Sequence, residues 1–259
     1  MVKLLKEANR IITLWREYGP DSKRIDLNII FREIVLPSSD GDRCAVKLDE
    51  FDSFEGMMLR PNDESFWIIA VNSRVLYRPR RNFTFAHEIG HFIGHRKLRR
   101  SFRCSTENIN DFQSDDLERE ANAFAAHVLM PPDIVRDFDE RHLFSYEAIC
   151  ELSELLFVSK EAAAYRWVAL SRRRIGYVVS RDGFVTKGRA SDALFRDGLF
   201  FRSGDELPSE SMALKVKSGG EILSSEVNPG VWHRTEGCKE DSYAAFHGGY
   251  IYTFLDFDE

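Results

Sequence analysis

The sequence has few cysteines, and no two of them are paired. Its 259 residues include only Cys44, Cys104, Cys150 and Cys238, with no Cys-x-x-Cys spacing among them. A cysteine-ligated zinc site needs paired spacings, so this class of site is excluded. We expect free thiols in a reducing compartment, because the scattered cysteines do not form the dense framework of a disulfide-stabilised secreted domain.

Long apolar runs are also missing. No stretch of about 18 apolar residues exists, so we expect no membrane span and no membrane partner. Residues 1–15 carry charged side chains among the apolar ones, namely Lys3, Lys6, Glu7 and Arg10. Such a segment lacks the apolar stretch of a signal peptide, and we therefore expect a cytoplasmic protein.

An excess of basic residues is absent as well. The 36 Lys and Arg against 42 Asp and Glu give a net charge of -6 with histidine neutral. This balance argues against nucleic-acid binding by the chain as a whole, although a local basic surface stays open. The hydrophobic share of 43% and the charged share of 30% are typical of a folded globular protein. The length fits one large domain or two small ones.

Hydrophobic periodicity separates a mixed first part of the chain from a β-rich last part. Helical spacing predicts helices over 3–18, 83–95 and 115–130, from 132 onward, and over 145–171 with a break at 157–159. Alternating or β-branched runs predict strands within 25–36 and over 44–48, 56–59 and 66–71. Turns or loops are expected at 37–43, 78–82 and 99–114. From residue 175 we expect at least three strands, a hairpin at Asp182-Gly183 and one short helix near 190–196.

The most informative motif is His-Glu-Ile-Gly-His at residues 87–91. Residues four apart lie on one face of a helix, so His87 and His91 can bind the same metal ion. Glu88 projects near that ion and can accept a proton from the attacking water. The apolar flanks of the motif and the predicted strand before it favour a catalytic metal over a buried helix with two satisfied histidines.

A catalytic zinc ion usually has a third protein ligand and one open position. His95 follows His87 by eight residues, about 12 Å along a straight helix, and is too far away to share the ion. The metzincin pattern is disfavoured because Lys97 stands where its third histidine would be. We therefore expect His95 to be an ordinary histidine at the end of the helix.

The predicted helix over 115–130 offers two glutamates as the third ligand. Glu118 and Asn122 are four residues apart and share one face. This spacing suits a metal-binding carboxylate followed by a polar residue that supports a histidine ligand. Glu120 lies about 200° further around the helix, so only one of the two glutamates can face the metal. We favour Glu118 and keep Glu120 as the alternative.

These residues give the chain a resemblance to the ImmA/IrrE family of metallo-endopeptidases. The matching stretches are residues 71–73, 82–92, 118–122, 124–126 and 129–131. The resemblance implies a zincin-like α+β peptidase domain, with zinc (Zn) held by His87, His91 and Glu118 and with Glu88 as the general base. It also implies that the substrate is a partner repressor of the helix-turn-helix (XRE-type) class, whose cleavage switches on stress-response or mobile-element genes.

We expect three parts in the chain. They are a zincin-like metallopeptidase domain over 1–140, a helix-turn-helix-like helical segment over 141–173, and a small α/β sensor-like domain over 174–259. The tight break at 157–159 is typical of a helix-turn-helix. Its second helix offers mainly Lys160, Glu161 and Arg166, so a packing or repressor-docking module is favoured over direct DNA binding.

Two other functions stay open from the sequence. The chain could be a non-proteolytic regulator that binds a cognate repressor or DNA through residues 141–259, or a toxin that a repressor-like partner neutralises. Tyr77, Arg78 and His142 are candidates for stabilising the oxyanion, and the sequence does not choose among them. The scattered residues His233, Cys238 and His247 predict no second metal site.

Overall fold

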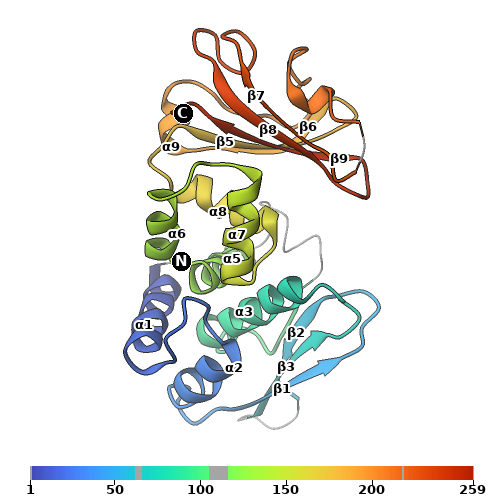
Figure 1. Cartoon of the computed structure of the whole chain (residues 1–259). Coiled ribbons are helices and arrows are strands. Elements are labelled where there is room, and N and C mark those ends of the chain that lie inside the picture. The colour runs from blue at the N-terminus through green and yellow to red at the C-terminus, as the bar shows by residue number, and fades with distance from the viewer. Residues whose placement is uncertain (1, 62–65, 105–115, 218, 259) are drawn as a thin grey trace. The chain divides into compact units, whose positions relative to one another are not determined.

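The computed structural model describes residues 2–61, 66–104, 116–217 and 219–258. Contacts between residues divide the chain into two compact units (Figure 1). The first unit consists of Met1–Pro131 and Leu155–Ser159, and the second of Pro132–Glu154 and Lys160–Glu259. Together they form a mixed α+β structure with two sheets. This grouping of contacts does not test the predicted division at residues 140 and 173, which stays a prediction.

The sheet of the first unit has four strands in the order β1-β3-β2-β4. Its strands are β1 (Arg43–Asp49), β2 (Gly56–Leu59), β3 (Phe66–Asn72) and β4 (Ser101–Cys104). β1 is parallel to β3, and β2 is antiparallel to both β3 and β4. The three strands predicted from alternation and β-branched residues are confirmed.

The edge strand β4 lies in a segment for which the sequence predicted a loop. Phe102 is buried in it, whereas Ser101 and Arg103 on either side are exposed. One buried residue in a four-residue strand is too short a pattern to recognise, and pairing with β2 decides the conformation. The remainder of the predicted loop, from residue 105 on, lies outside the described residues.

Three long helices accompany this sheet. They are α1 (Val2–Tyr18), α3 (Arg78–Gly94) and α5 (Asp116–Leu129), and α3 packs against α5 and against β2 and β3. Figure 1 shows α3 running beside the sheet. The predicted loop over 78–82 is wrong, because α3 already begins at Arg78. Pro79 stands in its first turn, where a missing backbone N–H leaves no helical hydrogen bond unmade.

The strand predicted within residues 25–36 is also wrong. The segment forms the short helix α2 (Leu27–Ile30) and a π-helical turn η1 (Phe31–Val35). The Asp26 carboxylate caps α2 by accepting hydrogen bonds from the backbone N–H groups of Asn28 and Ile29. The buried side chains recur at a helical spacing, and they are Leu27, Ile30, Phe31 and Val35.

The second unit combines helices with a five-stranded antiparallel sheet. Its helices are α6 (Pro132–Asp139), most of α7 (Tyr146–Leu156), α8 (Lys160–Leu170) and the short α9 (Asp192–Arg196), with a 3-10 turn η2 (Met212–Leu214). The strand order is β6-β5-β9-β8-β7, with β5 (Ile175–Arg181), β6 (Phe184–Ala190), β7 (Ile222–Val227), β8 (Cys238–Ala244) and β9 (Tyr250–Asp256). The predicted hairpin between β5 and β6 is confirmed, and both Asp182 and Gly183 have the positive φ that its turn requires.

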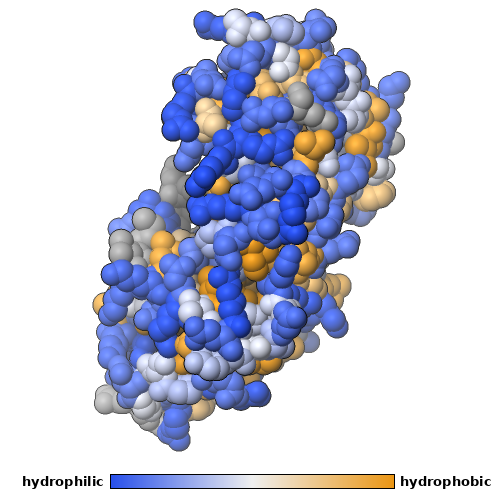
Figure 2. All heavy atoms as spheres, turned by 60° about the vertical axis from the view of Figure 1, so that its left-hand side comes forward, coloured by the Kyte–Doolittle hydropathy of each residue, from blue (hydrophilic) through white to orange (hydrophobic). Residues whose placement is uncertain are grey.

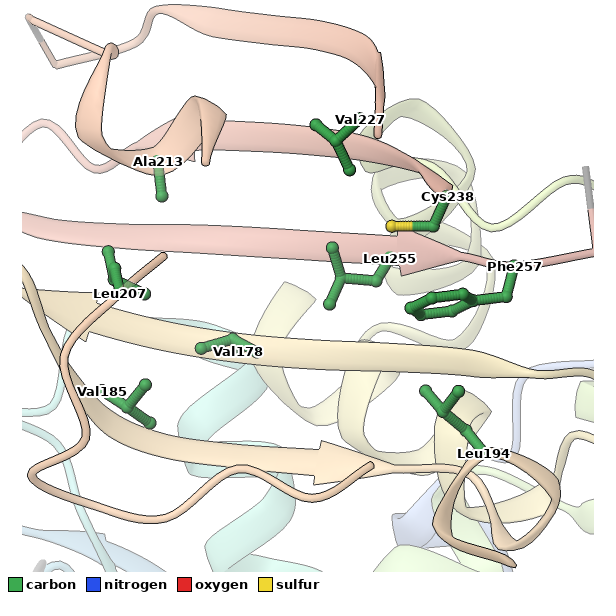
Figure 3. Close-up of a cluster of buried hydrophobic side chains, with 9 residues drawn as sticks. All are labelled: Val178, Val185, Leu194, Leu207, Ala213, Val227, Cys238, Leu255 and Phe257. Carbon is green, nitrogen blue, oxygen red and sulfur yellow. The ribbon is translucent and has the colours of Figure 1, made fainter. Parts of the chain in front are cut away.

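A buried cluster fills one face of this second sheet (Figure 3). Each strand contributes one side chain, and in strand order these are Val185, Val178, Leu255, Cys238 and Val227. Leu194 of α9 and Ala213 of η2 close the cluster from outside the sheet. Cys238 is therefore a core residue of this unit.

Within the described ranges, the helices are too short or too polar to cross a bilayer. A space-filling view shows hydrophilic residues over most of the visible face, with hydrophobic residues in smaller separate areas (Figure 2). Scattered exposed apolar residues of this kind are normal for a folded domain.

Candidate metal centre

Three donor side chains from two helices meet at one point in the first unit. α3 carries His87 and His91, and α5 carries Glu118. The Nε2 atoms of the two histidines are 3.0 Å apart. Glu118 lies 3.1 Å from His87 Nε2 through Oε2 and 3.3 Å from His91 Nε2 through Oε1. Among the described residues, this is the one group of three or more His, Cys, Asp or Glu whose donor atoms could share a metal ion.

The spacing of these donors fits a tetrahedral ion. Zinc binds histidine nitrogen and carboxylate oxygen at about 2.0–2.1 Å, so neighbouring donors in a tetrahedron are about 3.3–3.4 Å apart. The 3.0 Å between the two Nε2 atoms, and the 3.1 and 3.3 Å from each Nε2 atom to its nearer Glu118 oxygen, lie within a few tenths of an ångström of that value; the two oxygen distances involve different oxygens of the carboxylate. Three protein donors leave one of four positions for another group, which is the donor count of catalytic zinc sites.

The donor atoms are held in a buried environment. Both histidines are fully buried, and Glu118 is 8% exposed. Burial lowers the pKa of His91 to about 4. Burial alone would raise the pKa of Glu118, but its hydrogen bonds to, and electrostatic interactions with, His87 and His91 outweigh burial and leave that pKa well below its ordinary value. Neutral His91 and ionised Glu118 are the protonation states that bind a divalent cation.

Gly90 allows the two helices to approach closely enough for this contact. A Cβ atom on Gly90 would lie 3.1 Å from Cδ1 of Phe124 and 3.3 Å from Cα of Ala121, both on α5. Such contacts are tighter than normal, so a larger residue would force α3 and α5 apart. The glycine of the motif thus brings Glu118 within reach of the histidines on the neighbouring helix.

Glu88 is fully buried beside the donor cluster and faces strand β2. A Cβ atom on Gly56 would lie 2.8 Å from Oε1 of Glu88 and 2.5 Å from Cγ2 of Thr84. The absence of a side chain at Gly56 therefore makes the space that the Glu88 carboxylate occupies. The sequence predicted Glu88 as a site residue but gave no indication that a glycine on the predicted strand over 56–59 would shape its position.

The outward nitrogens of both histidines have polar neighbours. His87 Nδ1 lies 2.8 Å from Oδ1 of Asn122, which is the contact that a supporting role for Asn122 requires. His91 Nδ1 lies 2.9 Å from Nδ1 of His95. His95 does end α3, as its C-cap, but it is buried and contacts the donor cluster, which the sequence reasoning missed. Its spacing of four residues from His91, the same as between the two motif histidines, was the available signal.

The oxyanion candidates Tyr77 and Arg78 do not lie among the donor residues of this centre. Tyr77 is 54% exposed just before α3, and Arg78 begins that helix nine residues before His87, about 14 Å along the axis. His142 belongs to the second unit, where its ring stacks on Phe138 and its Nδ1 is 2.9 Å from the Phe138 carbonyl oxygen.

A buried pair of histidines on a helix with H-E-x-x-H spacing, joined by a glutamate from the next helix, is typical of metallopeptidases. Residues 46–168 match the family model of Peptidase_M78, described as the IrrE N-terminal-like domain. This segment contains all three donors, and it belongs to the ImmA/IrrE family of metallopeptidases. The resemblance predicted from the sequence is confirmed.

Comparison with solved structures gives a fold likeness over nearly the whole chain. A Mycobacterium tuberculosis transcriptional regulator is similar with a TM-score of 0.56 and 16% sequence identity, covering 99% of this chain and 77% of that one. At this identity the likeness shows the fold alone. No curated protein matches the sequence.

Proposed function

We propose that this protein is a zinc-dependent endopeptidase that cleaves a partner transcriptional repressor of the helix-turn-helix class. The observation that carries the proposal is the buried donor set of His87, His91 and Glu118 with Glu88 beside it. The family match supports a peptidase, because the motif residues lie inside the matched segment. The repressor as substrate is what the family resemblance implies.

The chemistry of the donors favours zinc. Two imidazole nitrogens and one carboxylate are the ligand set of many catalytic zinc sites, whereas magnesium and calcium prefer oxygen ligands. His87, His91 and Glu118 would hold the ion. When bound, zinc acts as a Lewis acid that polarises the scissile carbonyl and makes water more acidic.

Glu88 would move the proton in the hydrolysis. Its carboxylate accepts a proton from the water whose oxygen attacks the scissile carbonyl carbon. It then gives that proton to the amine nitrogen as the carbon–nitrogen bond breaks. Burial of Glu88, in the space left by the absent side chain at Gly56, keeps the carboxylate in one place for both transfers.

Two further observations support a regulatory protein as the substrate. The net charge of -6 would attract a basic DNA-binding protein. The structural neighbour is described as a transcriptional regulator, which fits a role in gene control for proteins of this fold. Cleavage of a repressor would relieve repression without any contact between this chain and DNA.

The second unit bears on the alternative of direct DNA binding. Lys160 Nζ donates a hydrogen bond to the Tyr146 hydroxyl at 2.8 Å, and Lys187 pairs with Glu161. Two of the three polar side chains that α8 would offer to base edges are thus engaged within the protein. This favours a packing or docking role for α7 and α8, and the outcome of the following experiment distinguishes the two functions.

The test compares the wild-type protein with Glu88→Gln, using as substrate a helix-turn-helix repressor found encoded next to this protein's gene. Zinc content of the purified proteins and cleavage of the repressor are measured together. We expect about one zinc per chain in both proteins and a loss of cleavage of about 10²–10⁴-fold in Glu88→Gln. Glu17→Gln, on the exposed face of α1, is the matched control and should cleave normally. Absence of zinc, or full repressor-regulating activity in Glu88→Gln, would refute the proposal and favour a non-proteolytic regulator.

A further inference from the structure

A chain of three side chains runs from the donor cluster to the neighbouring helix. His91 Nδ1 is 2.9 Å from His95 Nδ1, and His95 Nε2 is 3.3 Å from Oε2 of Glu120. His95 is 2% exposed, and the Glu120 side chain is 27% exposed. The glutamate that the sequence left open as a third ligand therefore contacts the centre through His95.

The end of α3 places His95 in this position. The helix ends at Gly94, and the backbone N–H of His95 still donates to the carbonyl of His91 at 2.8 Å. His95 itself has a φ of -123° and a ψ of -8°, so it leaves the helical path. The His95 ring lies one turn after the His91 ring, and the two ring centroids are 5.0 Å apart.

Hydrogen-bonding rules determine which ring nitrogens of His91 and His95 carry protons when a metal is bound to His91. A metal on His91 Nε2 leaves the proton of that neutral ring on Nδ1. His95 Nδ1 must then accept, which puts the proton of His95 on Nε2. That proton faces the Glu120 carboxylate, an acceptor, so every contact has one donor and one acceptor.

We propose that His95 and Glu120 are positioning residues that orient His91 and increase its basicity toward the metal. The inference rests on the proposed function, because it assigns the role relative to bound zinc. A carboxylate acting through an imidazole would do for His91 what the Asn122 amide does directly for His87. The two ligands would thus have different support, one from a neutral amide and one from an ionised group.

Packing alone is the competing explanation. Phe102 stacks on His91 with ring centroids 4.3 Å apart, and its ring lies 6.0 Å from that of His95. A buried ring at position 95 could simply fill this apolar space. His95→Leu keeps apolar volume beside Phe102 and removes the acceptor. His95→Asn restores an acceptor, because its Oδ1 branches from Cγ where the histidine Nδ1 does.

The experiment measures the Kd of Zn²⁺ for the full chain by competition with a chromophoric chelator. We expect binding about 10–100-fold weaker in His95→Leu and a smaller loss in Glu120→Gln. His95→Asn should bind zinc within a few-fold of wild type. The control is His127→Leu on α5, whose Nε2 lies 2.8 Å from Oδ1 of Asn9 on α1; its Kd should not change. Thermal unfolding of the metal-free proteins shows that all variants are folded.

A second readout follows the proton itself. In the zinc-loaded protein the His91 Nδ1–H should give a slowly exchanging proton resonance, present in wild type and in His95→Asn and absent in His95→Leu. Equal zinc affinity in His95→Leu and wild type would overturn the inference while leaving the proposed function intact. Equal losses in His95→Leu and His95→Asn would show packing instead and would also overturn it. A wild-type protein that binds no zinc would overturn both.

Discussion

Gly56 offers a sharp test of how the position of Glu88 is controlled. The substitution Gly56→Ala adds one methyl group on β2, facing α3. In the present geometry that methyl carbon would lie 2.8 Å from Oε1 of Glu88, 3.3 Å from its Cγ and 2.5 Å from Cγ2 of Thr84. A Cβ atom essentially never lies within 3.0 Å of another heavy atom, so both side chains must move.

The size of the effect follows from these distances. An ordinary contact begins near 3.4 Å, so the Glu88 oxygen must retreat by about 0.6 Å from its present 2.8 Å. Since a misplacement of about 1 Å at a reacting group can cost about 100-fold in rate, a shift of this size should lower kcat/KM about 10-fold. Overpacking should also destabilise the fold by about 1–3 kcal/mol.

The assay measures repressor cleavage, zinc affinity and thermal unfolding for Gly56→Ala. We expect zinc affinity within about twofold of wild type, because Gly56 contacts Glu88 and Thr84 rather than the donor cluster. Gly94→Ala at the end of α3 is the matched control, since the atoms nearest to its new methyl group belong to the flexible Leu4 side chain, at 3.3 Å or more. Wild-type cleavage by Gly56→Ala, with its stability reduced as expected, would refute the reasoning that Gly56 sets the position of the carboxylate.

Three further predictions concern protonation and ligand loss. Glu118→Gln should weaken zinc binding by at least 100-fold in the chelator competition, because the amide replaces the one anionic donor; retention of tight binding would exclude Glu118 as a ligand. The metal-free fold favours neutral His91, whose pKa burial lowers from 6.5 to about 4. The contribution of neutral His91 to the free energy of unfolding is therefore fully present above pH 6.5 and is lost as the pH falls toward 4, by up to about 3 kcal/mol. Urea unfolding of chelator-treated wild type and His91→Gln measures this loss. Burial raises the pKa of Cys44 and of Cys238 to about 12, so alkylation at pH 8 should be about 10³-fold slower than for free cysteine in peptide mapping.

Sequence patterns predicted those elements whose residues interact with near neighbours in the chain. The long helices α1 and α5 show apolar residues at regular spacing over several turns, and the structure places them as expected. The strand predicted within residues 25–36 is wrong, although the Asp26 cap and the helical spacing of the buried residues are both visible in the sequence. The prediction missed strand β4 for a different reason: pairing with β2, rather than the composition of β4 itself, determines its conformation.

The sequence predicted the part of the donor cluster that local helix geometry determines. His87 and His91 are four residues apart on one helix, so their proximity follows from helix geometry alone. Proximity of Glu118 depends on the packing of α5 against α3, which the sequence indicated only through the resemblance and the spacing to Asn122. The contribution of Gly56 to the position of Glu88 arises between a strand and a helix, and no spacing along the chain encodes it.

The two glutamates of α5 show where helical geometry succeeds and where it stops. An angle of about 200° between Glu118 and Glu120 correctly indicates that one of them alone can lie against the Nε2 atoms of the histidines. It does not follow that the other is remote, because α3 ends at Gly94 and His95 leaves the helical path. Glu120 thus contacts the ring of His95 while Glu118 contacts those of His87 and His91. One helix can therefore supply a proposed ligand from one face and the support for another ligand from a second face, because the opposing helix α3 ends just before His95.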